Sequence, residues 1–97
     1  MRARRVVVTG IGALTPIGNN LKEYWKSLVS GISGAAPITH FDASSFKTKF
    51  ACELKGFDAT DFINKKEARR LDKFSQYAMV VAEEAIRDSK IDINSID

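Results

Sequence analysis

Two side chains of this sequence have the reactivity that nucleophilic catalysis needs: the thiol of Cys52 and the imidazole of His40, each the single residue of its type. A reactive cysteine usually lies at the beginning of a helix or beside a base, where its thiolate is stabilised. Cys52 lies within a predicted strand, so we interpret it as a buried structural thiol. His40 lies in a predicted loop, and we interpret it as a surface or loop-packing residue. The spacing alone leaves a dyad of these two residues open.

The glycine-rich segment 10–20 is a second candidate site, because a strand followed by Gly10, Gly12 and a helix is typical of dinucleotide-binding turns. The spacing does not fit that motif. Its third glycine would stand at Thr15, and Pro16 interrupts the junction between turn and helix. The acidic residue expected about 20 positions further on is missing as well. We favour a tight structural turn and keep nucleotide binding as the alternative.

A cluster of basic residues is the third candidate, in the first two turns of a predicted helix. The helix dipole disfavours positive charge there by a few tenths to about 1 kcal/mol per residue, so stability alone would place acids at these positions. The spacing of Lys66, Arg69 and Arg70 predicts one exposed face, which favours binding of a local partner. The competing interpretation is a solvated helix end. The predicted site consists of Lys65, Lys66, Arg69 and Arg70.

Two strands and two helices are predicted to position these residues. The run Val6–Val8 is typical of a strand buried on both faces of a sheet. The first helix begins after Asn20, which can cap it together with Glu23, and ends at Gly31. The alternation over 48–54 predicts a half-exposed strand with Cys52 pointing inward.

The second predicted helix is long, begins at Asn64 with a capping box closed by Glu67, and continues to Ser89. We expect it to be largely buried. Small residues along its apolar stripe allow another helix or a sheet to approach closely. They are Ser75, Ala78, Ala82 and Ala85.

The chain has 97 residues, and its predicted elements leave apolar faces and strand edges without partners. We therefore expect a fragment of a larger α/β protein, or a chain that must associate to fold. The net charge of +3 is supplied by Arg2, Arg4 and Arg5, so no broad basic face predicts nucleic-acid binding. No segment is apolar enough to span a membrane or to act as a signal peptide. The single cysteine excludes an internal disulfide and suits the cytoplasm.

The residues resemble one known family along nearly the whole chain, the 3-oxoacyl-[acyl-carrier-protein] synthases of type II (beta-ketoacyl-ACP synthases). The opening run Arg4–Gly18 is shared among decarboxylating condensing enzymes, including polyketide ketosynthases. The later segments favour the enzyme of fatty acid elongation. They are Trp25, Gly31–Gly34, His40–Asp42, Phe46–Ala51 and Lys66–Tyr77.

The resemblance implies a thiolase-like fold, five-layered α/β/α/β/α in the complete enzyme, of which residues 1–97 would be the N-terminal part of the first domain. It implies a cytoplasmic homodimer that condenses an acyl group with malonyl-acyl-carrier-protein, with loss of carbon dioxide, to give 3-oxoacyl-acyl-carrier-protein. No cofactor is implied, because the substrates arrive on the phosphopantetheine arm of the carrier protein. A polyketide-type ketosynthase and a carrier-binding module without catalysis are the alternatives.

The resemblance also assigns roles to residues. The family's nucleophilic cysteine and two catalytic histidines have no counterpart here, so we expect no catalytic residue in this chain, and Cys52 does not match the nucleophile. Lys66 and Arg69 match basic positions at which the family binds acyl carrier protein, with Lys65 and Arg70 beside them. Carrier proteins are acidic, so a compact positive surface would attract and orient them.

Overall fold

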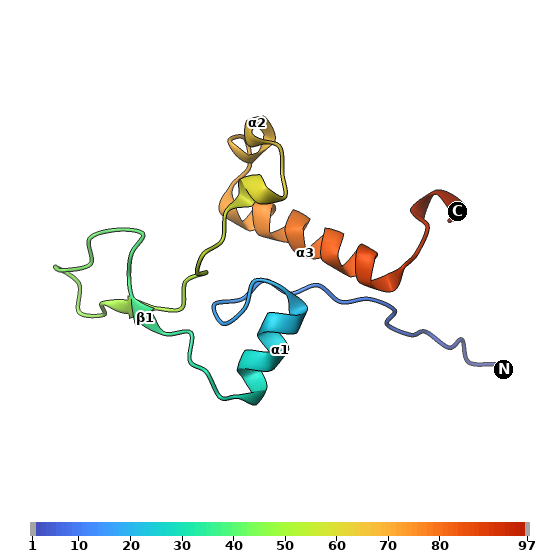
Figure 1. Ribbon diagram of the computed structural model, residues 1–97, viewed down its shortest axis with the longest axis horizontal. Coiled ribbons are helices and arrows are strands. Elements are labelled where there is room, and N and C mark those ends of the chain that lie inside the picture. Colours follow the sequence, from blue (N-terminus) through green and yellow to red (C-terminus); the bar gives the residue numbers. More distant parts are fainter. Residues whose placement is uncertain (1, 97) are drawn as a thin grey trace.

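The computed structural model describes residues 2–96, an elongated molecule with extents of 59, 36 and 26 Å. Its α-helices are α1 (Leu21–Val29), α2 (Lys65–Ala68) and α3 (Lys73–Ser89). The two short strands are β1 (Ala36–Pro37) and β2 (Phe50–Ala51), and the 3-10 turns are η1 (Ala59–Asp61) and η2 (Ile93–Ser95). α3 is the central element, with α2 at its N-terminal end and the N-terminal segment along its other half (Figure 1). None of the helices in residues 2–96 is long and apolar enough to cross a membrane.

The first predicted helix is confirmed as α1, with both of its predicted end signals. The side chain of Asn20 accepts a hydrogen bond from the backbone N–H of Glu23 at 2.9 Å. The Glu23 carboxylate accepts from the N–H of Asn19, one residue earlier than a capping box requires. Beyond the helix, Gly31 has a φ of 70°, and the N–H of Ile32 donates to a carbonyl of the last turn. A residue without a Cβ adopts this left-handed conformation at little cost, which explains why the helix ends here.

The predicted strand Val6–Val8 is wrong for the described chain, where this segment is extended but pairs with nothing. The side chains of Val6 and Val8 are 89% and 80% exposed. A strand forms only when a neighbour supplies hydrogen-bond partners to its backbone. Within residues 2–96 the one sheet is the β1–β2 pair, far along the chain.

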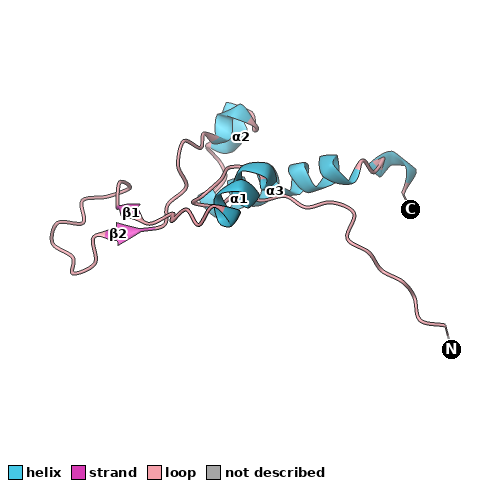
Figure 2. Cartoon of the chain, turned by 60° about the horizontal axis from the view of Figure 1, so that its bottom comes forward, coloured by secondary structure: helices cyan, strands magenta, loops and turns pink. Residues whose placement is uncertain are grey.

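The second predicted strand is confirmed in place but shortened to two residues. β2 pairs antiparallel with β1, with Ala51 opposite Ala36 and Phe50 opposite Pro37 (Figure 2). The predicted inward orientation of Cys52 is wrong, because its thiol is exposed. A two-stranded ribbon without a layer packed on it has no inner face, so alternation of apolar residues does not decide which side chains are buried.

The predicted helix 64–89 is divided into α2 and α3 by a turn at 69–72. Asn64 caps α2 as predicted, since its side chain accepts from the N–H of Lys66 at 2.8 Å, but in the described chain Glu67 does not close the predicted capping box. The side chain of Gln76 donates to the carbonyl of Ala68 at 2.8 Å, which satisfies the end of α2. The turn lets Ala68 fold back and become buried against Val80 of α3.

The core is small and lies where α2, η1 and α3 meet. It consists of Ala59, Ile63, Ala68 and Val80, with Leu14, Phe57 and Leu71 packed against it. The expectation that the last helix is largely buried is wrong, because Val80 is its single buried residue in the described chain. Phe74, for example, is 73% exposed.

The glycine segment packs directly on the C-terminal half of α3. A methyl group at Gly10 would overlap the carbonyl oxygen of Ala85, and one at Gly12 would overlap that of Val81. The predicted approach of another helix or a sheet along the small residues is not observed in the described chain: an extended segment contacts the helix backbone near Ala85, and Ala78 and Ala82 are exposed. The two glycines are needed for backbone contact with a helix, which supports the structural interpretation of this turn over nucleotide binding.

Lys55 ties the glycine segment to the β-ribbon. Its ammonium group donates to the carbonyls of Gly34 at 2.6 Å, Glu53 at 3.1 Å and Pro16 at 3.2 Å. The backbone carbonyl of Lys55 in turn accepts from the side chain of Asn19 at 2.8 Å. These bonds fix the path of the chain from the ribbon toward η1 and α2.

Candidate functional site

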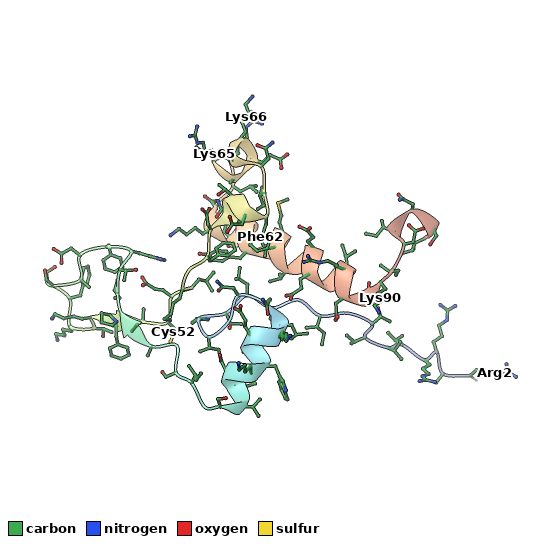
Figure 3. The ribbon with its side chains drawn as sticks, in the orientation of Figure 1. Arg2, Cys52, Phe62, Lys65, Lys66 and Lys90 are labelled. Carbon is green, nitrogen blue, oxygen red and sulfur yellow. The ribbon has the colours of Figure 1, made fainter. Side chains whose placement is uncertain are left out.

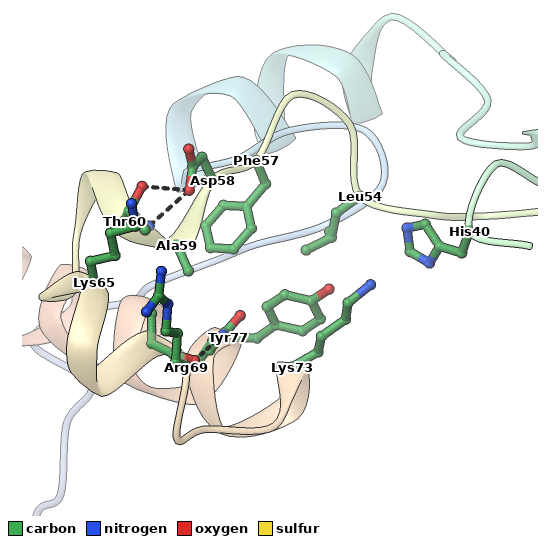
Figure 4. Close-up of a pocket in the computed structure, with 12 residues that line it drawn as sticks. His40, Leu54, Phe57, Asp58, Ala59, Thr60, Lys65, Arg69, Lys73 and Tyr77 are labelled. Carbon is green, nitrogen blue, oxygen red and sulfur yellow. Dashed lines mark hydrogen bonds between the residues drawn. The ribbon is translucent and has the colours of Figure 1, made fainter.

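A hollow of about 370 Å³ lies between the ribbon, η1, α2 and the start of α3. Three cationic side chains line it: Lys65 and Arg69 from the α2 region and Lys73 from the first turn of α3. Figure 4 shows them in a row, with Arg69 between the two lysines. His40 lies at the far end of the hollow, beyond Lys73. The hollow therefore brings two of the four predicted binding residues together with one cation outside the predicted set.

Aromatic rings form the wall behind these cations. The ring of Phe57 meets that of Tyr77 edge-on, with centroids 5.6 Å apart, and stacks on Phe62 with centroids 5.9 Å apart. Such pairs contribute about 0.5–1.5 kcal/mol each beyond the burial of their area. They connect η1 to α3, so they hold the two sides of the hollow in place.

Among residues 2–96, Asp58 is the one carboxylate that lines the hollow. One of its oxygens accepts from the hydroxyl of Thr60 at 2.7 Å and from the N–H of Thr60 at 2.9 Å. These two hydrogen bonds, the side-chain one first, lower the pKa of Asp58 below its ordinary value. Asp58 is thus ionised at neutral pH and caps η1.

The four predicted binding residues are all exposed, and none pairs with an acidic side chain in residues 2–96. Figure 3 shows Lys65 and Lys66 extending from the free end of α2. The prediction that Lys66, Arg69 and Arg70 share one face is wrong for the two arginines. Arg69 lines the hollow described above, whereas Arg70 lines a separate one with Glu67 and Met79. The reason is that α2 ends at Ala68, so helical spacing no longer applies beyond it.

His40 is held by Glu53. The Nδ1 atom of His40 lies 3.4 Å from a carboxylate oxygen of Glu53. Glu53 also accepts from the hydroxyl of Thr39 at 2.9 Å and from the N–H groups of Thr39 and His40 at 3.1 and 3.2 Å. Burial alone would raise the pKa of Glu53, but these hydrogen bonds and the charge of His40 lower it overall. In the described chain the imidazole thus has a carboxylate as its partner, and no bond joins it to Cys52.

Lys73 belongs to the same concentration of positive charge in the sequence, but the predicted binding site did not include it. The available signal was its position four residues after Arg69 and eight after Lys65, a spacing of one helix face. That signal was weak, because the helix is broken between Arg69 and Lys73. The turn between α2 and α3 places both side chains in the lining of the same hollow. Nothing in residues 2–96 groups three potential metal-ligating side chains.

A family model, described as "Beta-ketoacyl synthase, N-terminal domain", matches residues 3–97. The chain belongs to the beta-ketoacyl synthase family. The resemblance drawn from the sequence is thereby confirmed.

The ketosynthase relatives include several enzymes named "3-oxoacyl-[acyl-carrier-protein] synthase 2". That of a Synechocystis strain is 48% identical over 97 residues, covering 100% of this chain and 23% of the relative. That of Staphylococcus aureus strain COL is 50% identical over 91 residues, 94% of this chain and 22% of the relative. That of Vibrio cholerae is 46% identical over 94 residues, 97% of this chain and 23% of the relative. The chain thus spans less than a quarter of the length of these relatives.

Two solved ketosynthase structures are similar in conformation as well. "The ishigamide ketosynthase/chain length factor" matches with a TM-score of 0.86 and 35% identity, over 96% of this chain and 23% of that one. The second match is a chain from a structure described as a "type II PKS acyl-carrier protein in complex with its ketosynthase bound to the hexaketide". It has a TM-score of 0.71 and 32% identity, over 94% of this chain and 23% of that one. The expected fold class is therefore confirmed at the level of the ketosynthase N-terminal domain.

Proposed function

We propose that this chain works within a 3-oxoacyl-acyl-carrier-protein synthase of fatty acid elongation, an acyltransferase that condenses an acyl group with malonyl-acyl-carrier-protein. The observation that carries the proposal is 48% identity to such an enzyme across the whole chain. The proposal includes a thiolase-like, five-layered complete protein that acts as a cytoplasmic homodimer. Its nucleophile and histidines would lie outside these 97 residues.

Within that enzyme, the proposed contribution of the chain is to bind acyl carrier protein. Lys65, Lys66, Arg69 and Arg70 are exposed and lack acidic partners in the described chain, so their charges are free to act on a ligand. A local group of unpaired cations attracts an acidic protein over about one Debye length, roughly 8–10 Å at physiological salt. It also fixes the orientation of the complex, because like charges are excluded from contact. No cofactor takes part in this step.

Charge reversal tests the proposal. In the condensing enzyme that carries these residues, Lys66→Glu with Arg69→Glu is expected to raise the KM for the acyl-carrier-protein substrate at least about tenfold. The KM for a small acyl thioester should stay within about twofold, since that substrate needs no protein docking. Reversal of Lys47 and Lys49, exposed cations near β2, is the matched control. Equal effects on the carrier-bound and the small substrate would contradict carrier docking.

A polyketide-type ketosynthase is the second candidate. It is favoured by the solved relatives, one of which is described as bound to a hexaketide. Their identities of 32% and 35% are lower than the 46–50% of the fatty acid enzymes, which is why we place elongation first. Product analysis after repeated condensation separates the two: accumulation of unreduced polyketide chains would favour the polyketide enzyme.

A further inference from the structure

The turn between α2 and α3 divides the basic cluster into two groups with different surroundings. Lys65, Arg69 and Lys73 line the hollow of about 370 Å³, whereas Lys66 and Arg70 do not. None of the three cations in the hollow pairs with an acid in the described chain. A common hollow lined by unpaired cations is a stronger indication of a defined ligand than charge on an open surface.

The balance of charge in the hollow is positive. Three cations face one carboxylate, that of Asp58, which already accepts two hydrogen bonds from Thr60. At the far end, the carboxylate of Glu53 lies against His40 and receives the N–H groups of the ribbon. Both acids are therefore satisfied by local donors and leave the lysines and the arginine available to an anion.

The shape and lining of the hollow indicate the class of anion. Arg69 lies at the centre of the row, and a guanidinium group matches two oxygens of a phosphate or carboxylate at once. The flanking lysines act as point charges. Phe57 and Leu54 provide apolar surface beside the cations, which a bare inorganic ion would not use but an organic chain attached to it would.

We propose that this hollow is a binding subsite for the phosphate group of an extended phosphate ester. Arg69 is the central contact, Lys65 and Lys73 flank it, and Lys66 and Arg70 contribute no direct contact. If carrier docking holds, the ester is the one that joins the carrier protein to its pantetheine arm, and this assignment rests on the proposed function.

The subsite itself is tested with inorganic phosphate. Amide chemical shifts of the condensing enzyme that carries these residues are followed during titration at pH 7 and constant ionic strength, with chloride as the reference because screening alone also shifts signals. We expect saturable shifts near Arg69 and Lys73. Neutralising Arg69 and Lys73 together, each to Gln, should weaken phosphate binding about tenfold. Neutralising Lys66 and Arg70 in the same way should change it less than about twofold.

Two results would overturn the subsite: shifts that do not saturate, or equal weakening by both pairs of substitutions, which is the behaviour of diffuse charge. Lys73→Gln alone guards against misfolding, because Lys73 is exposed and its side chain makes no internal hydrogen bond in the described chain. An unchanged amide spectrum away from the hollow confirms that this variant is folded. If the hollow binds phosphate, this folded variant must also bind phosphate more weakly than the unsubstituted protein.

Carrier protein with and without its phosphopantetheine arm identifies the source of the phosphate. Lys73→Gln should weaken binding of the carrier with the arm about threefold to tenfold and leave that of the carrier without the arm unchanged. Equal weakening of both forms would mean that the hollow binds carboxylates of the carrier, which contradicts the phosphate assignment. If inorganic phosphate binds but neither carrier form does, carrier docking fails and the phosphate subsite stands.

Discussion

Each end of α3 contains a charge that the helix dipole disfavours, although Arg87 in the last turn is a charge that it favours. Lys73 lies in the first turn, near the positive end, and Asp88 lies in the last turn, near the negative end. At the C-terminal half the acids are compensated. Glu84 accepts from the N–H groups of Ala13 and Leu21 at 2.8 and 3.0 Å, and Asp88 accepts from that of Ile11 at 3.0 Å.

At the N-terminal end no such compensation is present in the described chain. Lys73 and the neighbouring Arg69 have no acidic partner, and the Asp72 side chain does not cap the helix. The comparison distinguishes charged residues with a structural role from charged residues that can bind a ligand on the same helix. Charges that bind backbone N–H groups hold a loop in place, whereas charges that nothing in the chain neutralises are available to a ligand.

The largest expected effect on stability is at the C-terminal half of α3, where the glycine-rich segment packs on the helix. Gly12→Ala would place a methyl group onto the carbonyl oxygen of Val81, and backbone atoms on both sides cannot yield easily. We expect the free energy of unfolding to fall by about 3 kcal/mol or more, measured by chemical denaturation. Gly31→Ala is the control: its methyl group meets open space, and the cost of about 1–2 kcal/mol comes from the positive φ alone. Equal losses in the two variants would contradict close packing of the glycine segment on α3.

Removal of the Glu84 carboxylate, which accepts hydrogen bonds from the segment that packs on α3, should lower the free energy of unfolding by a smaller amount. Glu84→Ala leaves the N–H groups of Ala13 and Leu21 without their acceptor, with an expected loss of about 1–3 kcal/mol of stability. Amide hydrogen exchange at these two positions should become faster. Glu83→Ala alters the exposed neighbour, whose carboxylate binds no N–H in the described chain, and should leave both rates unchanged. Unchanged exchange in the Glu84 variant would mean that its hydrogen bonds do not hold the loop.

At the ligand end, stability and binding should move in opposite directions. Lys73→Glu places an acid in the first turn of α3, and we expect a gain of about 0.3–1 kcal/mol from the dipole. The same change should weaken binding of inorganic phosphate about tenfold, as the double neutralisation of Arg69 and Lys73 does. Lys22→Glu, in the first turn of α1, is the matched control, because it brings the same dipole gain away from the hollow. A loss of stability in the Lys73 variant would show that the cation has a structural role.

The smallest effect concerns Glu53, a third acid bound to backbone N–H groups. Its pKa is lowered in the folded chain, so its contribution to stability is present above the ordinary glutamate pKa of about 4.3 and is lost as the pH falls through the lower folded value. The amide signal of Thr39 should titrate with a midpoint below that ordinary value. In Glu53→Gln this titration should disappear. A midpoint at or above the ordinary value would contradict the hydrogen bonds of the ribbon.

Part of the candidate site could be predicted from the sequence. The residues Lys65, Lys66, Arg69 and Arg70 stood out by charge type and position, and their exposure agrees with the structure. Their division between two hollows could not be predicted, because it depends on where α2 ends. Asp72 is a common helix-capping residue and could have indicated the start of α3, although its side chain makes no capping bond here.

The sequence by itself determined the local features of this protein. The beginning and end of α1 and the beginning of α2 were predictable, since helix ends are decided by residues within about four positions of each other. The tertiary structure alone decided which of these features meet. The packing of Gly12 on Val81, the unpaired Val6–Val8 segment, the exposed Cys52 and the entry of Lys73 into the hollow all depend on residues distant in the chain. Contacts of that kind are set by packing and by the availability of hydrogen-bond partners, neither of which is encoded in local spacing.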